Sequence, residues 1–230
     1  MPRETFDREL RRLQDEMLAM GSMVENAIVG SVETLKQRDF EASSELIAQD
    51  RRINDMRYAI ENDALILLAT QQPMAGDLRT IAAVLEITTE LERMGDYAKG
   101  IAKINLMIGE EALIKPLIDL PKMADRTSSM LHRALDAFVR RDVDLALQIP
   151  LDDEEVDEYY NLIYRELMDL IVSDPTNTEQ ANQLLWAAHN LERTADRVIN
   201  ICERVVFTVT GKMVELDKME GESITLESII

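Results

Sequence analysis

The chain contains an internal repeat, and this repeat limits its possible folds more than any other feature. The six-residue pattern Leu-Glu-Arg-x-x-Asp occurs at residues 91–96 and again one hundred residues later, at residues 191–196. Shorter matches follow the same order and lie 103 residues apart: Arg38-Asp39 with Arg141-Asp142, and Asp50-x-x-Ile53 with Asp153-x-x-Val156. A turn that is three residues shorter in the second half explains the change of offset. Such self-similarity indicates a duplicated structural unit.

The repeated unit is predicted to be helical. Near the N-terminus, apolar side chains alternate spacings of four and three, which indicates an amphipathic helix over about residues 5–38: Phe6, Leu10, Leu13, Met17, Met20, Val24 and Ala27. Only 8 glycines and 4% aromatic residues are present, whereas Met occurs 13 times, and straight-chain side chains lose little rotamer freedom in a helix. The alternation that is typical of strands is nearly absent. We therefore expect an all-α protein.

Capping residues and helix breakers divide each unit into three helices. Asp39 and Asp142 are suited to cap helix N-termini, Pro150 should kink or interrupt the fifth helix, and Gly211 can end the sixth. Long helices joined by short turns are typical of antiparallel bundles. The expected organisation is two tandem three-helix bundles, with six long antiparallel helices in all. The first bundle covers residues 1–108, a connector covers 109–121, the second bundle covers 122–211 and a tail covers 212–230. The first helix of the second bundle is expected to begin at about Lys122.

Charge and residue types exclude several classes of function. The net charge of −19 repels phosphate backbones, so nucleic-acid binding is not expected. Cys202 is the only cysteine, which excludes an internal disulfide and fits the cytoplasm. The charged N-terminus does not read as a signal peptide, and the longest apolar run, residues 64–69, is too short to span a bilayer. The chain has no Gly-rich phosphate loop and no Cys/His cluster, so no enzyme is predicted.

The acids of the repeated motif are the candidate site residues. They lie four residues apart, so both carboxylates point the same way on a helix. On the third helix, Glu92 and Asp96 continue the stripe of Leu78, Ile81 and Leu85, which predicts that they point inward. The equivalent acids of the second half are Glu192 and Asp196. Burying two like charges is costly unless a cation or a set of hydrogen-bond donors compensates them.

Two kinds of compensation fit this spacing. Arg93 and Arg193 lie three residues before Asp96 and Asp196, the spacing of a salt bridge that only locks neighbouring helices together. The alternative is a pair of metal sites in which carboxylates from facing helices share a cation; Mg, Mn, Ca and iron suit such ligands, and zinc is compatible with them. The 2 histidines do not supply the Glu-x-x-His pattern of a di-iron oxidase.

Three segments resemble the PhoU family: MLAMGSMVENAI, QQPMAGDLRTIAAVLEITTELERMGDYAKGIA (Gln71–Ala102) and NLERTADRVINICE. The resemblance extends over essentially the whole chain. It implies two similar three-helix bundles and a negative regulator of the bacterial phosphate-starvation response. Such a regulator is expected to link the ATPase subunit of the phosphate ABC transporter with a membrane sensor histidine kinase. Its expected place is the cytoplasm, at the face of the inner membrane.

The same resemblance implies a metal. Some PhoU proteins carry iron or zinc clusters on Glu/Asp-x-x-x-Asp motifs. Mapped onto this sequence, the candidate ligands are Glu92, Asp96, Glu192 and Asp196, flanked by Arg93 and Arg193. Asp50 and Asp153 are weaker candidates, because they also recur between the halves.

The leading prediction of function is a non-enzymatic cytoplasmic adaptor that restrains phosphate uptake and phosphate-starvation signalling. One alternative is a metal-storage or metal-dependent bundle protein, and another is a purely structural helical scaffold. The long heptad helix near the N-terminus also predicts self-association, as a homodimer.

Overall fold

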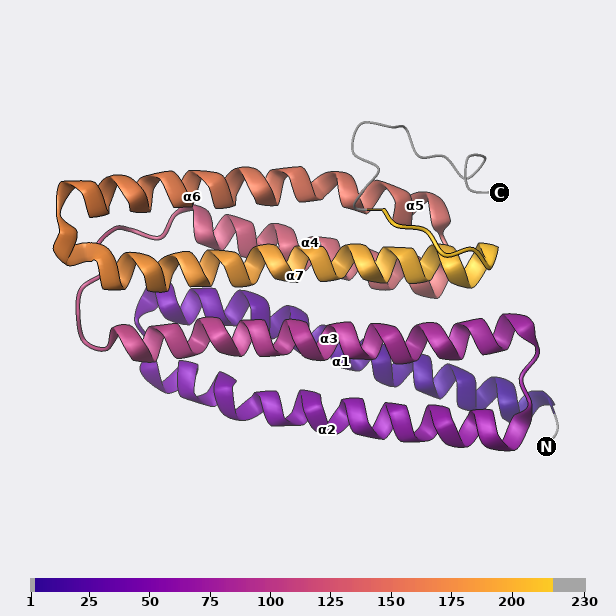
Figure 1. Ribbon diagram of the computed structural model, residues 1–230. Helices are drawn as coiled ribbons and strands as arrows, with labels where there is room; N and C mark the ends of the chain where they lie inside the picture. Colours follow the sequence, from indigo (N-terminus) through magenta and orange to yellow (C-terminus); the bar gives the residue numbers. More distant parts are fainter. Residues whose placement is uncertain (1–2, 217–230) are drawn as a thin grey trace.

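The computed structural model describes residues 3–216, in which every element of secondary structure is a helix (Figure 1). The first half contains α1 (Arg3–Gln37), α2 (Phe40–Gln71) and α3 (Ala75–Ile108). The second half contains α4 (Asp119–Arg140), α5 (Val143–Gln148), the 3-10 segment η1 (Ile149–Asp152), α6 (Asp153–Ser173), the 3-10 segment η2 (Pro175–Asn177) and α7 (Thr178–Thr210). Each half packs as a three-helix bundle, with α5, η1 and α6 together in the place of one helix, which confirms the predicted fold.

The two halves share the local structure that starts their second helices. Asp39 accepts a hydrogen bond from the Ala42 backbone N–H at 2.9 Å, and Asp142 accepts one from the Leu145 N–H at 2.9 Å. The residue before each cap is an arginine with positive φ, +60° in the first half and +55° in the second. Both N-cap predictions are therefore confirmed, and so is the repeat that suggested them.

Two prolines affect the helices differently. Pro150 lies in η1, where the expected fifth helix is interrupted as predicted, because proline removes a backbone donor and clashes with the preceding turn. Pro121, by contrast, lies inside α4, which begins at Asp119 rather than at Lys122. In the first turn of a helix the missing N–H has no intrahelical partner to lose, so proline is tolerated there.

The heptad face of α1 is covered by the chain itself. Leu13, Met17, Met20 and Val24 are all at most 1% exposed and belong to the common core. The expectation that this face mediates self-association is therefore wrong, because its apolar side chains already pack within the chain.

The halves meet along two helix pairs, α3 against α7 and α1 against α4. Figure 1 shows α3 and α7 running antiparallel side by side through the middle of the molecule. At the second pair, a Cβ atom added to Gly21 of α1 would lie 2.3 Å from Leu135 Cδ1 of α4, so the close approach of these helices depends on glycine. The two bundles consequently share one continuous core.

The connector and the start of the tail are held against the second bundle. The Gln180 side chain accepts from the Ile114 N–H at 2.6 Å and donates to the Ala112 carbonyl at 3.0 Å. Beyond α7, the Leu216 N–H donates to Glu203 at 2.9 Å, and Leu216 is buried. The rest of the predicted tail, 217–230, lies outside the described residues.

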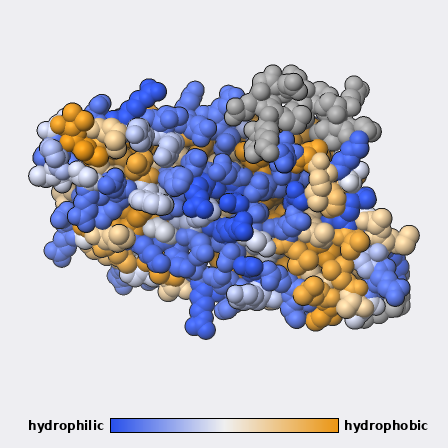
Figure 2. All heavy atoms as spheres, in the orientation of Figure 1, coloured by the Kyte–Doolittle hydropathy of each residue, from blue (hydrophilic) through white to orange (hydrophobic). Residues whose placement is uncertain are grey.

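The face of the molecule seen in Figure 2 is mainly polar. Figure 2 shows hydrophilic side chains over most of one face and an apolar area at the lower right, where the turn between α2 and α3 lies. Exposed apolar residues close to this turn are Leu65, Ile66, Met74 and Leu78. Across residues 3–216, no helix combines the length and apolar character that a membrane span requires.

Candidate functional site

In the first half, a lysine ammonium lies between two of the candidate acids. Lys99 Nζ is 2.7 Å from Asp50 Oδ2 and 3.0 Å from Asp96 Oδ1. The hydrogen bond to Asp50, followed by the one to Asp96, raises the pKa of Lys99 above its ordinary value. Only 8% of the Asp50 side chain is exposed, so α3 supplies the charge that makes its burial in α2 tolerable.

The other carboxylate oxygen of Asp50 is not satisfied. Asp50 Oδ1 is buried and has no hydrogen-bond partner among the described residues, while Oδ2 also accepts from Asn54 Nδ2 at 3.2 Å. Oδ1 faces α3 at Gly95, where an added Cβ atom would lie 3.8 Å from it and 3.1 Å from Ile53 Cδ1. A groove of about 170 Å³ between α1, α2 and α3 reaches Asp50 and Lys99.

A second cation compensates the remaining acid of the first motif. Arg57 of α2 lies 3.2 Å from Glu92 Oε1 through Nη1 and 2.8 Å from Glu61 Oε1 through Nε. The Glu92 side chain is 16% exposed, so this ion pair is largely shielded from water. Lys99 and Arg57 thus each pair with two carboxylates around the first motif.

The second half lacks both cations. At the established offsets, the counterpart of Lys99 is Ile199, which is buried in the core, and the counterpart of Arg57 is Tyr160. Within residues 3–216, Glu192 and Asp196 form no ion pair with a lysine or arginine. The nearest basic group to Glu192 is His189, whose Nδ1 lies 3.2 Å from Glu192 Oε2.

The pKa values reflect this difference. Burial and the negative charge of Asp196 raise the pKa of Glu192. Burial and the negative charge of Asp157 raise the pKa of Asp196. Nearby positive charges lower both values in part: Arg197, His189 and Arg193 act on Asp196, and His189 and Arg193 act on Glu192. The carboxylates of the second half therefore lie in a field that favours the arrival of a further cation.

The arginines of the motifs do not pair with the acids that follow them. Arg93 Nη1 lies 3.6 Å from Glu90 Oε1, and the Arg193 guanidinium lies over the Tyr97 ring, 4.4 Å from its centroid. The predicted salt bridges to Asp96 and Asp196 are thus absent from the described residues. Arg93 instead pairs with Glu90, three residues before it on α3, and Arg193 makes a cation–π contact from α7 to α3.

The predicted inward stripe is also only partly correct. Ile81 is fully buried, but Leu78 is 47% exposed and Asp96 is exposed as well. Because α3 packs against α1, α2 and α7, its buried face is wide, and Leu85 lies at the edge of that face rather than at its centre. A stripe drawn through Leu85 therefore runs along the border of the core.

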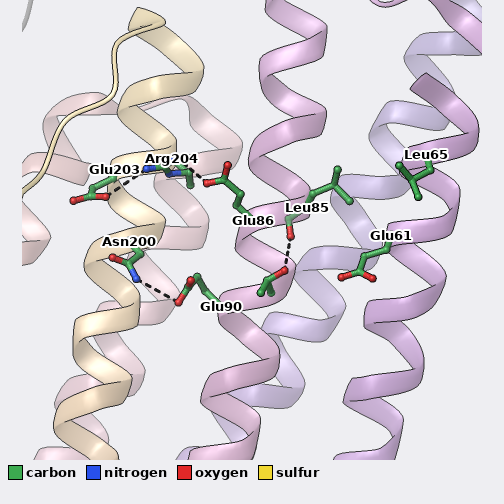
Figure 3. A pocket seen from close by; sticks show the side chains of 9 residues that line it. Glu61, Leu65, Leu85, Glu86, Glu90, Asn200, Glu203 and Arg204 are labelled. Atoms are coloured by element: carbon green, nitrogen blue, oxygen red, sulfur yellow. Dashed lines mark hydrogen bonds and ion pairs between the residues drawn. The ribbon is translucent and has the colours of Figure 1, made fainter. Parts of the chain in front are cut away.

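Polar residues also line a groove of about 430 Å³ between α2, α3 and α7 (Figure 3). Arg204 of α7 pairs with Glu86 of α3 at 2.7 Å, and Glu90 accepts from Asn200 at 3.3 Å. Glu90 also lies 3.4 Å from Arg197 of α7. These contacts join the two halves, and Arg204 and Arg197 compensate part of the negative charge of the groove.

In the first half, the ion pairs with Lys99 and Arg57 occupy the acids that a metal would use. Across residues 3–216, no three His, Cys, Asp or Glu side chains are arranged to hold a metal ion. Metal binding by Glu92, Asp96, Glu192 and Asp196, with Asp50 and Asp153 as weaker candidates, stays a prediction.

Sequence reasoning missed Lys99, Arg57 and Tyr160. Lys99 lies three residues after Asp96, and this spacing predicts an ion pair between them. The contacts of Asp50 with Lys99 and of Arg57 with Glu92 depend on how α2 packs against α3.

Fold and site define a class: an all-α protein of two tandem three-helix bundles with an Asp/Glu motif in each. The model of the PhoU domain matches residues 17–104 and again residues 120–205. The chain belongs to the PhoU family.

Relatives match along nearly the whole chain. The phosphate-specific transport system accessory protein PhoU homolog of Clostridium acetobutylicum is 37% identical over 218 residues, which cover 94% of this chain and 100% of that protein. The crystal structure of the phosphate transport system regulatory protein PhoU from Streptococcus pneumoniae aligns with a TM-score of 0.83 at 34% identity, covering 91% of this chain and 99% of that one. PhoU from Pseudomonas aeruginosa gives a TM-score of 0.85 at 32% identity, covering 90% and 100%.

Proposed function

We propose that this protein is a non-enzymatic accessory protein of the phosphate-specific transport system that restrains phosphate uptake and phosphate-starvation signalling. The observation that carries the proposal is similarity along the full length of a relative: this chain aligns with the whole accessory protein of Clostridium acetobutylicum at 37% identity. The similar protein from Streptococcus pneumoniae is a phosphate transport system regulatory protein, which supports the same role.

The proposed mode of action is that of an adaptor. It works in the cytoplasm, at the inner face of the membrane, and contacts the ATPase subunit of the phosphate ABC transporter and a sensor histidine kinase. A surface that is mainly polar and carries a net charge of −19 suits reversible contacts with basic partner surfaces. The proposal needs no catalytic group of its own, since the signal passes through contacts with partners.

The proposed function does not depend on the oligomeric state, which is tested separately. A homodimer remains the expectation, although the heptad face of α1 is not its interface. The mass of the untagged protein in solution, measured by light scattering during size-exclusion chromatography, distinguishes a monomer of 26.2 kDa from a dimer.

A gene deletion tests the regulatory role. In medium with abundant phosphate, the deletion strain should express phosphate-starvation genes, measured as alkaline phosphatase or a reporter of the same response. A plasmid copy of the wild-type gene should restore repression. Normal repression in the deletion strain would contradict the proposal.

A further inference from the structure

The second half has a surface on α6 and α7 that the first half lacks. We call it the α6–α7 patch; its residues are Tyr160, Tyr164, Trp186, His189, Glu192 and Asp196. The Trp186 side chain is 58% exposed and Tyr164 is 43% exposed. The rings of Trp186 and His189 meet edge to face with centroids 5.7 Å apart, and His189 and Tyr160 are 6.3 Å apart. The aromatic rings thus meet at His189, whose Nδ1 lies 3.2 Å from Glu192 Oε2.

The equivalent positions of the first half carry charged and polar groups instead. At the offsets of the repeat, Tyr160 and Tyr164 correspond to Arg57 and Glu61, and Trp186 corresponds to Glu86. In the first half, the Arg57 guanidinium occupies the space beside Glu92. In the second half that guanidinium is missing, and an aromatic ring stands at its position.

The acids of the patch lack a strong internal partner. Glu192 Oε2 is buried and has no hydrogen-bond partner among the described residues, although His189 Nδ1 is 3.2 Å away. The two nearby arginines of α7 point to α3, where Arg193 stacks on Tyr97 and Arg197 pairs with Glu90. Burial, followed by the negative charge of Glu192, raises the pKa of Tyr160.

We propose that the α6–α7 patch binds an arginine side chain of a partner protein, which packs on the aromatic rings beside His189 and pairs with Glu192, while Asp196, one turn further along α7, adds negative charge. The arginine takes the role that Arg57 has beside Glu92 in the first half. Guanidinium groups stack on aromatic faces and pair with carboxylates, and Trp, Tyr and Arg are the side chains that dominate binding energies at interfaces. The net charge of −19 favours a basic partner.

An organic cation fits the patch better than a metal ion does. Tyr160, Tyr164 and Trp186 make up half of the patch, and their rings stabilise a guanidinium but do not coordinate a hard metal. The inference rests on the proposed adaptor role in one respect: the cation is a side chain of a partner protein.

Trp186 is the only tryptophan of the chain, so intrinsic fluorescence reports on the patch directly. The probe is an alanine-based helical peptide with two arginines four residues apart, and the control peptide has glutamates in their place. The arginine peptide should change the fluorescence saturably and more weakly as salt rises, and the glutamate peptide should not. No saturable change with the arginine peptide would overturn the proposal.

Matched variants locate the binding. Glu192→Gln with Asp196→Asn should weaken binding of the arginine peptide at least tenfold, whereas Glu92→Gln with Asp96→Asn should leave it unchanged. Thermal melting of both variants verifies that they fold. Equal losses in the two variants would overturn the proposal, as would saturable binding of Mn²⁺ or Zn²⁺ that requires Glu192 and Asp196 and excludes the peptide.

Chromosomal alleles separate this inference from the proposed function. Strains with Trp186→Ala, or with the Glu192→Gln/Asp196→Asn pair, should lose repression at abundant phosphate while the folded protein remains present at its normal level. If the deletion strain loses repression but these alleles keep it, the inference fails and the regulatory role stands. If the deletion strain itself represses normally, the regulatory role fails.

Discussion

Lys99 holds Asp50 across the gap between α3 and α2, with its ammonium nitrogen 2.7 Å from the carboxylate. In the second half, the equivalent of this lysine is the buried Ile199. The two copies of the unit therefore differ at this position: the first has a salt bridge between Lys99 and Asp50, and the second has an apolar core residue, Ile199. The acids of the second motif must obtain their compensation elsewhere.

Replacing Lys99 with Met should destabilise the protein by about 1–3 kcal/mol, because Asp50 would remain buried without its ammonium partner. Urea unfolding of the Lys99→Met variant measures this loss. Lys103→Met is the matched control, since Lys103 lies one turn further along the same helix and is exposed. Equal stability of the two variants would show that Asp50 does not depend on Lys99.

The contribution of Lys99 should depend on pH in the alkaline range. Its folded pKa is raised, so its stabilising effect is complete below the pKa of an unfolded lysine, about 10.4, and is lost as pH rises through the higher folded pKa. The difference in unfolding free energy between wild type and Lys99→Met should therefore be constant from pH 7 to about 9 and shrink above about 10.4. A difference that grows in that range would contradict this assignment.

The two glutamates of the repeated motif should respond in opposite ways to neutralisation. Glu92→Gln removes the partner of Arg57 and should lower the free energy of unfolding by about 0.5–1 kcal/mol. Glu192 has a raised folded pKa, so its ionised form opposes folding at neutral pH, and Glu192→Gln should raise stability by up to about 1 kcal/mol.

The same argument fixes the pH dependence of Glu192. A raised carboxyl pKa gives stability that is present below the unfolded value, about 4.3, and lost as pH rises through the folded value. The advantage of Glu192→Gln over wild type should consequently appear at neutral pH and vanish in acid. Chemical unfolding at pH 7 and at about pH 4 measures it, and shifts of the same sign in both glutamate variants at pH 7 would refute the difference between the halves.

The close contact between α1 and α4 predicts that a larger side chain at Gly21 destabilises the protein. Gly21→Val would place new atoms where Leu135 now lies and should destabilise the protein by about 1–3 kcal/mol. Gly76→Val is a suitable control, because an added Cβ there meets no atom within 4 Å and should change stability by less than about 1 kcal/mol. Comparable melting temperatures for both variants would mean that the halves do not pack closely at Gly21.

Local signals predicted most of the fold. The aspartate caps at 39 and 142 and the interruption at Pro150 depend on residues within one turn of the helix, and all three were foreseen. The site was harder to predict, because Asp50 and Lys99 are 49 residues apart and meet only through packing of α2 on α3. The periodicity of α3 was also misleading at Leu85, since a helix that contacts three others has no single buried stripe.

The two acids of the first motif are paired with the protein's own cations, Glu92 with Arg57 and Asp96 with Lys99. The metal content of untagged protein tests this pairing directly, with wild type compared with Glu92→Gln/Asp96→Asn and with Glu192→Gln/Asp196→Asn. The first-half variant should carry the same amount of metal as wild type, whether that amount is zero or stoichiometric. Metal that is present in wild type and lost from the folded first-half variant would contradict the account.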